Sequence, residues 1–405
     1  MNRKLSKLKK LLINLILLLI AVVISLAAGE AIIRMLYKDK IVLYPRYHTD
    51  AFYGEYQIRR LRPNSEFWHT SVDGSWKFIT NAQGFRDKRN FKYEKPPNTL
   101  RILSLGDSHT QGFEVRQEHT FSSVIEKYIN NYIRQNGITA ETEVINAGIV
   151  GFSTAEELVF LENEGVKYKP DFVILAFSGN DFDDNVKCDL FQLNNDGDLV
   201  VKSKKHVPGV KILNMINSFA LLRWASENSY LYSFLLNSVW DSSKQLLYSK
   251  KVKELTTEYA IQKGDVNEYE IALTQRLVER MYKFCQNNGI RLIVLDVPVV
   301  DNDRFKPSIP PRLDTVITAN SDIFIRSDVV LNEVCGVTEI FVPHGHRHIS
   351  EVTHLHFGIA IAKEILSHYN ISKSEWGLLN TQIPPMSTET EVDTKKKELV
   401  EINGK

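Results

Sequence analysis

A serine stands between an aspartate and a histidine at the end of a hydrophobic run. The run Ile102 to Leu105 predicts a buried strand, and it stops at Gly106-Asp107-Ser108. A serine hydroxyl becomes a useful nucleophile only when a base removes its proton, and acyl transfer also needs donors for the oxyanion. Glycine before the serine permits the tight turn that would present the hydroxyl. We therefore interpret Ser108 as a candidate nucleophile whose partners come from elsewhere in the chain.

Two further strand ends carry groups that can donate hydrogen bonds. The strand predicted at 143–145 leads into a loop that contains Gly151, and the strand predicted at 172–177 leads into Ser178-Gly179-Asn180. A glycine lets its backbone N–H face a ligand, and an asparagine side chain adds a neutral donor. Together with the Ser108 amide, Gly151 and Asn180 could form a three-donor oxyanion hole. The alternative for Asn180 is a turn that caps its strand.

These three blocks carry a family resemblance. In order and spacing, GDS at 106–108, NAGIVGFS at 146–153 and SGND at 178–181 resemble the first three blocks of the SGNH, or GDSL, hydrolase superfamily. The resemblance covers roughly residues 100 to 370 and implies a flavodoxin-like three-layer α/β/α fold with ester hydrolysis by a serine. By position it makes Ser108 the nucleophile and Gly151 and Asn180 oxyanion partners. Ser178 departs from the pattern, since that block usually has glycine there.

The fourth block of that family supplies the histidine, usually with an aspartate three residues ahead of it. This chain has no such pair, but Glu351 stands three residues before His354. We predict His354 as the base and Glu351 as the acid that orients it, because a base needs both reach and an orienting partner. His348 is the alternative base. It precedes Ser350, a possible helix N-cap, but Gly345 stands where its acid would be.

The histidines of this region raise a metal site as an alternative. They are His344, His346, His348, His354 and His356. Histidines two apart share one side of an extended strand, and with Glu351 they could bind zinc. The chain has no HExxH motif and only three scattered cysteines, so we expect neither a metal nor a cofactor. His109 is expected to shape the pocket, because adjacent residues rarely share the direction that proton transfer needs.

The elements that must position these residues follow an alternating pattern. Strands are predicted at 102–105, 143–145, 172–177, 291–297 and 339–342, and helices at 121–133, 155–163, 269–286 and 357–368. Uninterrupted hydrophobic strands that alternate with helices indicate a parallel sheet covered on both faces. Ligands bind such sheets beyond the carboxyl ends of the strands, where Ser108 lies.

The other segments surround this predicted domain, which spans 99–370. Residues 40–98 are rich in aromatic residues and turn signals and predict a small β-containing lead-in. Residues 185–266 form a hydrophobic, helical insertion, which we interpret as a cap over the ligand-binding edge, with extra core as the alternative. Residues 382–405 are polar, charged and interrupted by proline, and are predicted to be disordered.

The N-terminus predicts a membrane segment. Residues 1–10 are basic, and residues 11–28 form an uncharged apolar run. About 18 residues at 1.5 Å each give roughly 27 Å, close to the ~30 Å hydrocarbon core. Basic residues in front favour a cytoplasmic N-terminus and an extracytoplasmic domain. A cleavable signal peptide is the alternative, although its apolar region usually has only ~7–15 residues.

The net charge of +1 provides no positive field that would attract nucleic acid. Location and resemblance together suggest a single-pass, membrane-anchored serine esterase. Its expected substrates are O-acyl esters, such as acetyl groups, on a cell-envelope or exported glycan. Two alternatives stay open. The same serine could transfer the acyl group to a sugar hydroxyl, or the chain could bind acylated glycan without turnover.

Overall fold

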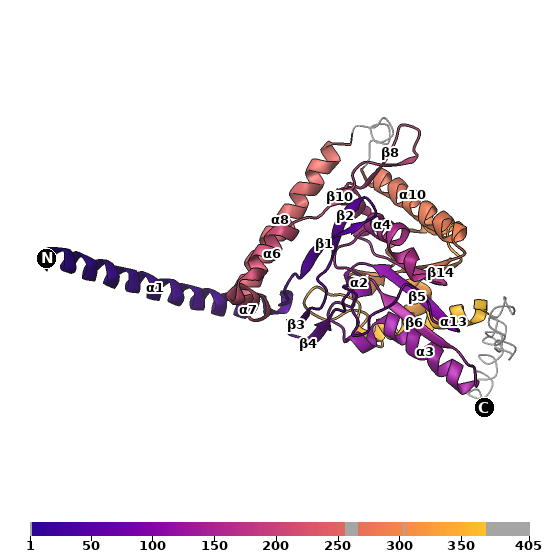
Figure 1. Cartoon of the computed structure of the whole chain (residues 1–405), viewed down its shortest axis with the longest axis horizontal. Coiled ribbons are helices and arrows are strands. Elements are labelled where there is room, and N and C mark those ends of the chain that lie inside the picture. The colour runs from indigo at the N-terminus through magenta and orange to yellow at the C-terminus, as the bar shows by residue number, and fades with distance from the viewer. Residues whose placement is uncertain (1, 256–265, 303, 370–405) are drawn as a thin grey trace, which may run out of the picture.

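The centre of the molecule is a five-stranded parallel sheet with the order β14-β11-β7-β5-β6. The computed structural model describes residues 2–255, 266–302 and 304–369 (Figure 1). The strands of the sheet are β5 (Thr99–Gly106), β6 (Glu141–Asn146), β7 (Phe172–Phe177), β11 (Arg291–Asp296) and β14 (Ile323–Ile325). Every pairing in it is parallel. The carboxyl ends of the strands therefore share one edge, with β5 between β6 and β7.

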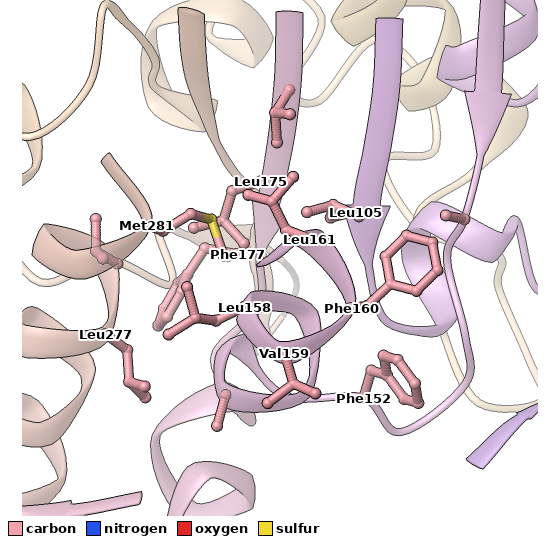
Figure 2. Packing of buried hydrophobic residues seen from close by; sticks show 14 of the residues in the cluster. Leu105, Phe152, Leu158, Val159, Phe160, Leu161, Leu175, Phe177, Leu277 and Met281 are labelled. Carbon is pink, nitrogen blue, oxygen red and sulfur yellow. The ribbon is translucent and has the colours of Figure 1, made fainter. Parts of the chain in front are cut away.

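Helices cover both faces of this sheet, which confirms the three-layer α/β/α architecture. On one face, α3 (Phe121–Gln135) and α13 (Glu351–Tyr369) pack against each other and against alternate side chains of the strands. On the other face lie α4 (Thr154–Asn163) and α10 (Val266–Asn287). Figure 2 shows Leu161 of α4 and Met281 of α10 beside Leu175 of β7. Full burial of each such side chain contributes about 1.5–3 kcal/mol.

The C-terminal part of the domain differs from the sequence prediction. Residues 339–342, predicted as the fifth strand, form only an isolated bridge between Phe341 and Ile349, and the fifth strand is β14. Three residues are too few to show a periodicity. Helix α13 begins at Glu351 and not at 357, because the Ser350 hydroxyl caps it by accepting the N–H of Thr353 at 3.2 Å.

The lead-in consists of two hairpins. Strand β1 (His48–Tyr53) pairs with β2 (Tyr56–Leu61), and β3 (Glu66–Ser71) pairs with β4 (Gly74–Ile79). Strand β10 (Lys205–His206) of the insertion extends the first hairpin by pairing in parallel with β2.

Over its described residues, the insertion also contains β8 (Phe191–Leu193), β9 (Leu199–Val201) and the helices α6 (Val210–Ser218), α7 (Ala220–Asn228) and α8 (Tyr230–Lys253). Helix α6 contacts β1, α7 contacts β3, and α8 contacts α5 (Asp181–Cys188). A role as a cap stays a prediction. The tail predicted to be disordered lies outside the described residues.

The remaining short elements connect these units. They are α2 (Ser108–Gln111), α11 (Pro311–Ala319), α12 (Ser327–Leu331), β12 (Val299–Asp301), β13 (Arg304–Lys306) and the 3₁₀ helices η1 (Lys38–Lys40), η2 (Gln117–His119) and η3 (Gly165–Tyr168).

Helix α1 (Asn2–Tyr37) extends away from the domain (Figure 1). It is the one helix in the described part of the chain that is long and apolar enough to cross a membrane, and its apolar window is not buried by the protein.

Candidate active site

The turn after β5 presents Ser108. Gly106 has φ +150°, and a Cβ at this residue would lie 2.0 Å from Thr110 Oγ1, so only glycine fits. Helix α2 begins at Ser108, and its N-cap Asp107 accepts the N–H of His109 at 2.8 Å. The Ser108 side chain is thus held at the carboxyl edge of the sheet, in a residue that is 8% exposed.

The imidazole that meets Ser108 belongs to His348. Its Nε2 lies 2.8 Å from Ser108 Oγ. The loop that carries His348 is closed by the N–H of Val342, which donates to the His348 carbonyl at 2.8 Å. The centroid of the His348 ring lies 4.7 Å from that of the Phe113 ring. Burial, helped by the neighbouring His109, lowers the pKa of His348 to about 3. The ring is therefore neutral at pH 7 and can accept the hydroxyl proton.

A third group, Glu114, stands behind the imidazole. Its Oε2 lies 3.4 Å from His348 Nδ1, and the same oxygen accepts the N–H of His346 at 3.3 Å. Its side chain is fully buried, and burial raises the pKa of Glu114 to about 7. Ser108, His348 and Glu114 thus form a chain from hydroxyl to imidazole to carboxyl, the order in which a serine nucleophile is activated.

Sequence reasoning missed Glu114. The signal available was an acid inside the otherwise uncharged stretch Gly112 to Val115, six residues after the serine. Its contact with the histidine loop depends on two residues in left-handed backbone conformations, Glu114 at φ +58° and Gly345 at φ +63°. A Cβ on Gly345 would lie 2.2 Å from Glu114 Oε1, so glycine permits this close approach.

The loop after β6 lies against the nucleophile turn. Asn146 Nδ2 donates to the carbonyl of Thr110 at 2.8 Å, and the Val150 N–H donates to Gln111 Oε1 at 2.9 Å. Gly151 follows at φ +73°, and its carbonyl accepts a hydrogen bond from Arg59 of the lead-in. The Gly151 N–H thus belongs to a loop that is tied to the serine turn on one side and to the lead-in on the other.

Asn180 follows β7 and is the N-cap residue of helix α5. Its side-chain Nδ2 donates to Asp184 Oδ2 at 3.0 Å. The residue is exposed, unlike its neighbours Ser178 and Asp181, which are buried. The order of the strands brings the Gly151 and Asn180 loops to the two sides of the Ser108 turn. Their part in an oxyanion hole stays a prediction, and Asn180 would have to turn from Asp184 to a substrate.

The sequence model of GDSL-like lipases and acylhydrolases matches residues 102–310, just over half of the 405 residues. The chain belongs to this family. Its members are acylhydrolases, and the chain is accordingly an ester-hydrolysing enzyme. A search of curated protein sequences found no match.

Solved structures of esterases and lipases are similar to the GDSL domain at low sequence identity. A lipase/acylhydrolase from Enterococcus faecalis is 17% identical, with a TM-score of 0.34 over 66% of this chain and 95% of its own. A two-domain esterase active on acetylated mannans is 13% identical, with a TM-score of 0.36 over 72% and 54%. A further match, named TesA, is 13% identical, with a TM-score of 0.35 over 66% and 98%.

The fourth block of the GDSL pattern needs a correction. His354, the predicted base, lies in the first turn of α13, where its Nδ1 accepts the N–H of Phe121 at 3.1 Å and its ring is fully buried. Glu351, its predicted orienting acid, instead binds Arg116 Nε at 2.8 Å and His119 Nδ1 at 2.7 Å. The early start of α13 turns both residues toward α3 and η2. The loop that precedes Ser350, the N-cap residue of α13, brings His348, the alternative candidate, to Ser108.

The histidine-rich segment does not have the geometry expected for a metal-binding strand. Gly345 and Arg347, at φ +63° and +52°, break the extended backbone that would align alternate histidines. His344 Nδ1 turns to Asp73 at 2.8 Å, whereas His346 stacks on Phe113 with 5.5 Å between ring centroids. Among the residues that the structure describes, no group of three or more potential ligands could hold a metal ion.

Proposed function

We propose that this GDSL-family chain is a membrane-anchored serine esterase that uses Ser108, His348 and Glu114. The observation that carries the proposal is the 2.8 Å contact between His348 Nε2 and Ser108 Oγ. The neutral imidazole accepts the serine proton as Oγ bonds to the ester carbonyl carbon. It then gives that proton to the departing alcohol, and water releases the acid from the acyl-enzyme by the same steps. Glu114 stabilises the His348 imidazolium, which exists after the ring accepts the serine proton and before it gives that proton away.

The oxyanion is held by the N–H groups of Ser108 and Gly151 together with the Asn180 side chain. The support for this assignment is the strand order, which sets the loops after β6 and β7 on either side of the Ser108 turn. Each donor acts on charge that develops only in the transition state, and loss of one typically costs about 3 kcal/mol.

The proposed location follows from α1. Its uncharged run would span the bilayer, and its basic N-terminal flank favours a domain outside the cytoplasm. An enzyme held there would meet O-acyl groups, such as acetyl, on cell-envelope or exported glycans. This substrate class extends the proposal from family and location to a specific chemistry.

The test uses the full chain in detergent with p-nitrophenyl acetate and with an O-acetylated oligosaccharide. Release of acetate is expected from both, to be lost in Ser108→Ala, and to survive a chelator. Ser104→Ala is the matched control, because this buried serine lies on β5, four residues before the nucleophile. Equal rates in wild type and Ser108→Ala would overturn the proposal and leave an acyl-glycan-binding protein. Acetate that passes to an added acceptor sugar would identify a transferase.

A further inference from the structure

The insertion helices expose large apolar side chains beside the point where α1 leaves the domain. These side chains form what we call the α6–α8 apolar face. Each is 55–73% exposed, and the members are Ile212, Met215, Phe219, Leu221, Trp224, Leu235 and Val239. Soluble monomers seldom expose such large apolar patches unless these contact a partner or a membrane.

The spacing of these residues gathers them on one side of each helix. Ile212, Met215 and Phe219 are separated by three and four positions along α6 and its C-cap. Leu221 and Trp224 repeat this spacing on α7, and Leu235 and Val239 on α8. Residues three and four apart lie on the same face of a helix. In Figure 1 the three helices lie on the side of the domain from which α1 extends.

The junction between α1 and α8 fixes this face relative to the apolar run. Glu30 caps the start of α8 by accepting the N–H groups of Tyr230 at 3.0 Å and Leu231 at 2.9 Å and the Ser229 hydroxyl at 2.8 Å. The neighbouring Gly29 allows close contact, since a Cβ there would lie 3.1 Å from Leu231 Cδ2. The uncharged run ends at Ala28, immediately before this junction.

A bilayer that contains this run therefore has its surface at the junction of α7 and α8. Trp224 and Leu221 lie five and eight residues before Ser229. At 1.5 Å per residue these separations are at most about 12 Å along α7. Interfacial amphipathic helices bury their apolar faces about 5–10 Å into the headgroup region, and tryptophan is enriched at that depth.

We propose that the α6–α8 apolar face lies on the lipid of the same bilayer that α1 spans, and so holds the hydrolase domain against the membrane surface. This inference rests on the anchoring part of the proposed function. Lipid is the favoured occupant because Glu30 fixes the face to the end of the membrane-spanning run.

The experiment places an environment-sensitive fluorophore on the full chain in lipid nanodiscs. The background variant is Cys335→Ser, because the other two cysteines, Cys188 and Cys285, are buried. One protein carries the label at Leu221→Cys. The matched control carries it at Val329→Cys, which is 68% exposed on α12, an element that packs against α13. Lipids with a doxyl quencher below the headgroup are expected to quench the Leu221 label strongly and to leave the Val329 label unchanged.

Two readouts separate this inference from the anchoring on which it depends. Release of the chain from membranes by alkaline carbonate would overturn the anchoring itself. A chain that resists carbonate but shows no lipid quenching at Leu221 would overturn only the proposed contact. A blue-shifted Leu221 label that doxyl lipid does not quench would identify a protein or a second copy as the occupant, which also contradicts the proposal.

Discussion

The serine and the histidine of the site are held by different kinds of structure. Ser108 follows β5, which is paired on both sides within the sheet, and its turn is hydrogen-bonded to the loop after β6. His348 lies in a loop that is held mainly by residues far away in the chain. The His344 N–H donates to Asp73 at 2.9 Å, and the Gly345 N–H donates to the carbonyl of Asp39 at 2.9 Å.

Because of this difference, we expect substitutions in one region to affect mainly stability and substitutions in the other to affect mainly activity. The Ser108 turn is part of the cooperatively folded core, so substitutions there are expected to lower the stability of the whole domain. The histidine loop depends on the lead-in and on the residues just after α1, so damage there should reduce activity first.

The largest effect is expected from the two competing histidines. His348→Gln should lower kcat by about 10⁴-fold or more, because removal of the base disables the nucleophile. The kcat of His354→Gln should stay within about tenfold of the wild-type value, since the contact of His354 with Phe121 makes it a packing residue. This variant should also unfold at a lower temperature than the wild type. Steady-state kinetics and thermal unfolding of both variants provide the comparison. The reverse ranking in kcat would restore His354 as the base.

Glu114→Gln should lower kcat by about 10³-fold, because the imidazolium loses its carboxylate. The wild-type rate should rise as pH increases through about 7, where Glu114 ionises, and the variant should lack this rise. The sign for stability is the opposite. The pKa of Glu114 in the folded state lies above the ordinary 4.5, so ionisation of this group destabilises the fold as pH rises. At pH 8, Glu114→Gln should therefore unfold at a higher temperature than the wild type. A pH-independent difference in rate would argue against this role.

Asn180→Ala should reduce kcat by about 10²-fold with little change in KM, because its amide acts on the transition state. Asn288→Ala is the control, since its side chain only caps the end of α10 by donating to the Phe284 carbonyl. Equal kinetics of the two variants would limit the role of the Asn180 side chain to its hydrogen bond with Asp184.

The smallest effect is expected from Gly345→Ala. A Cβ there displaces Glu114 and occupies a strained backbone conformation, which costs about 1–3 kcal/mol of unfolding free energy. The kcat should also fall by about tenfold, which corresponds to 1.36 kcal/mol of barrier. Gly289→Ala is the matched control, because its φ of +67° is similar and nothing lies within 4 Å of its Cβ position. A fall in kcat for both glycines would show that strain alone explains the loss.

The sheet and the position of Ser108 at its carboxyl edge could be predicted from sequence because both follow from local patterns. Strands buried on both faces are continuous apolar runs, and parallel pairing brings their ends together. The sequence did not allow us to predict which acid lies behind the imidazole, or that His348 rather than His354 lies beside Ser108. Glu114 reaches His348 through left-handed backbone at Glu114 and Gly345, and contacts more than 200 residues apart fix the loop. The nearest acid in sequence, Glu351, pairs with Arg116 instead.

The most direct measurement is covalent labelling of the full chain with a fluorophosphonate, followed by mass spectrometry of the peptides. We expect one phosphonyl adduct on Ser108, absent in Ser108→Ala, formed far more slowly in His348→Gln and at the wild-type rate in His354→Gln. An adduct on a different residue, or a labelling rate that does not change when His348 is replaced, would contradict the account.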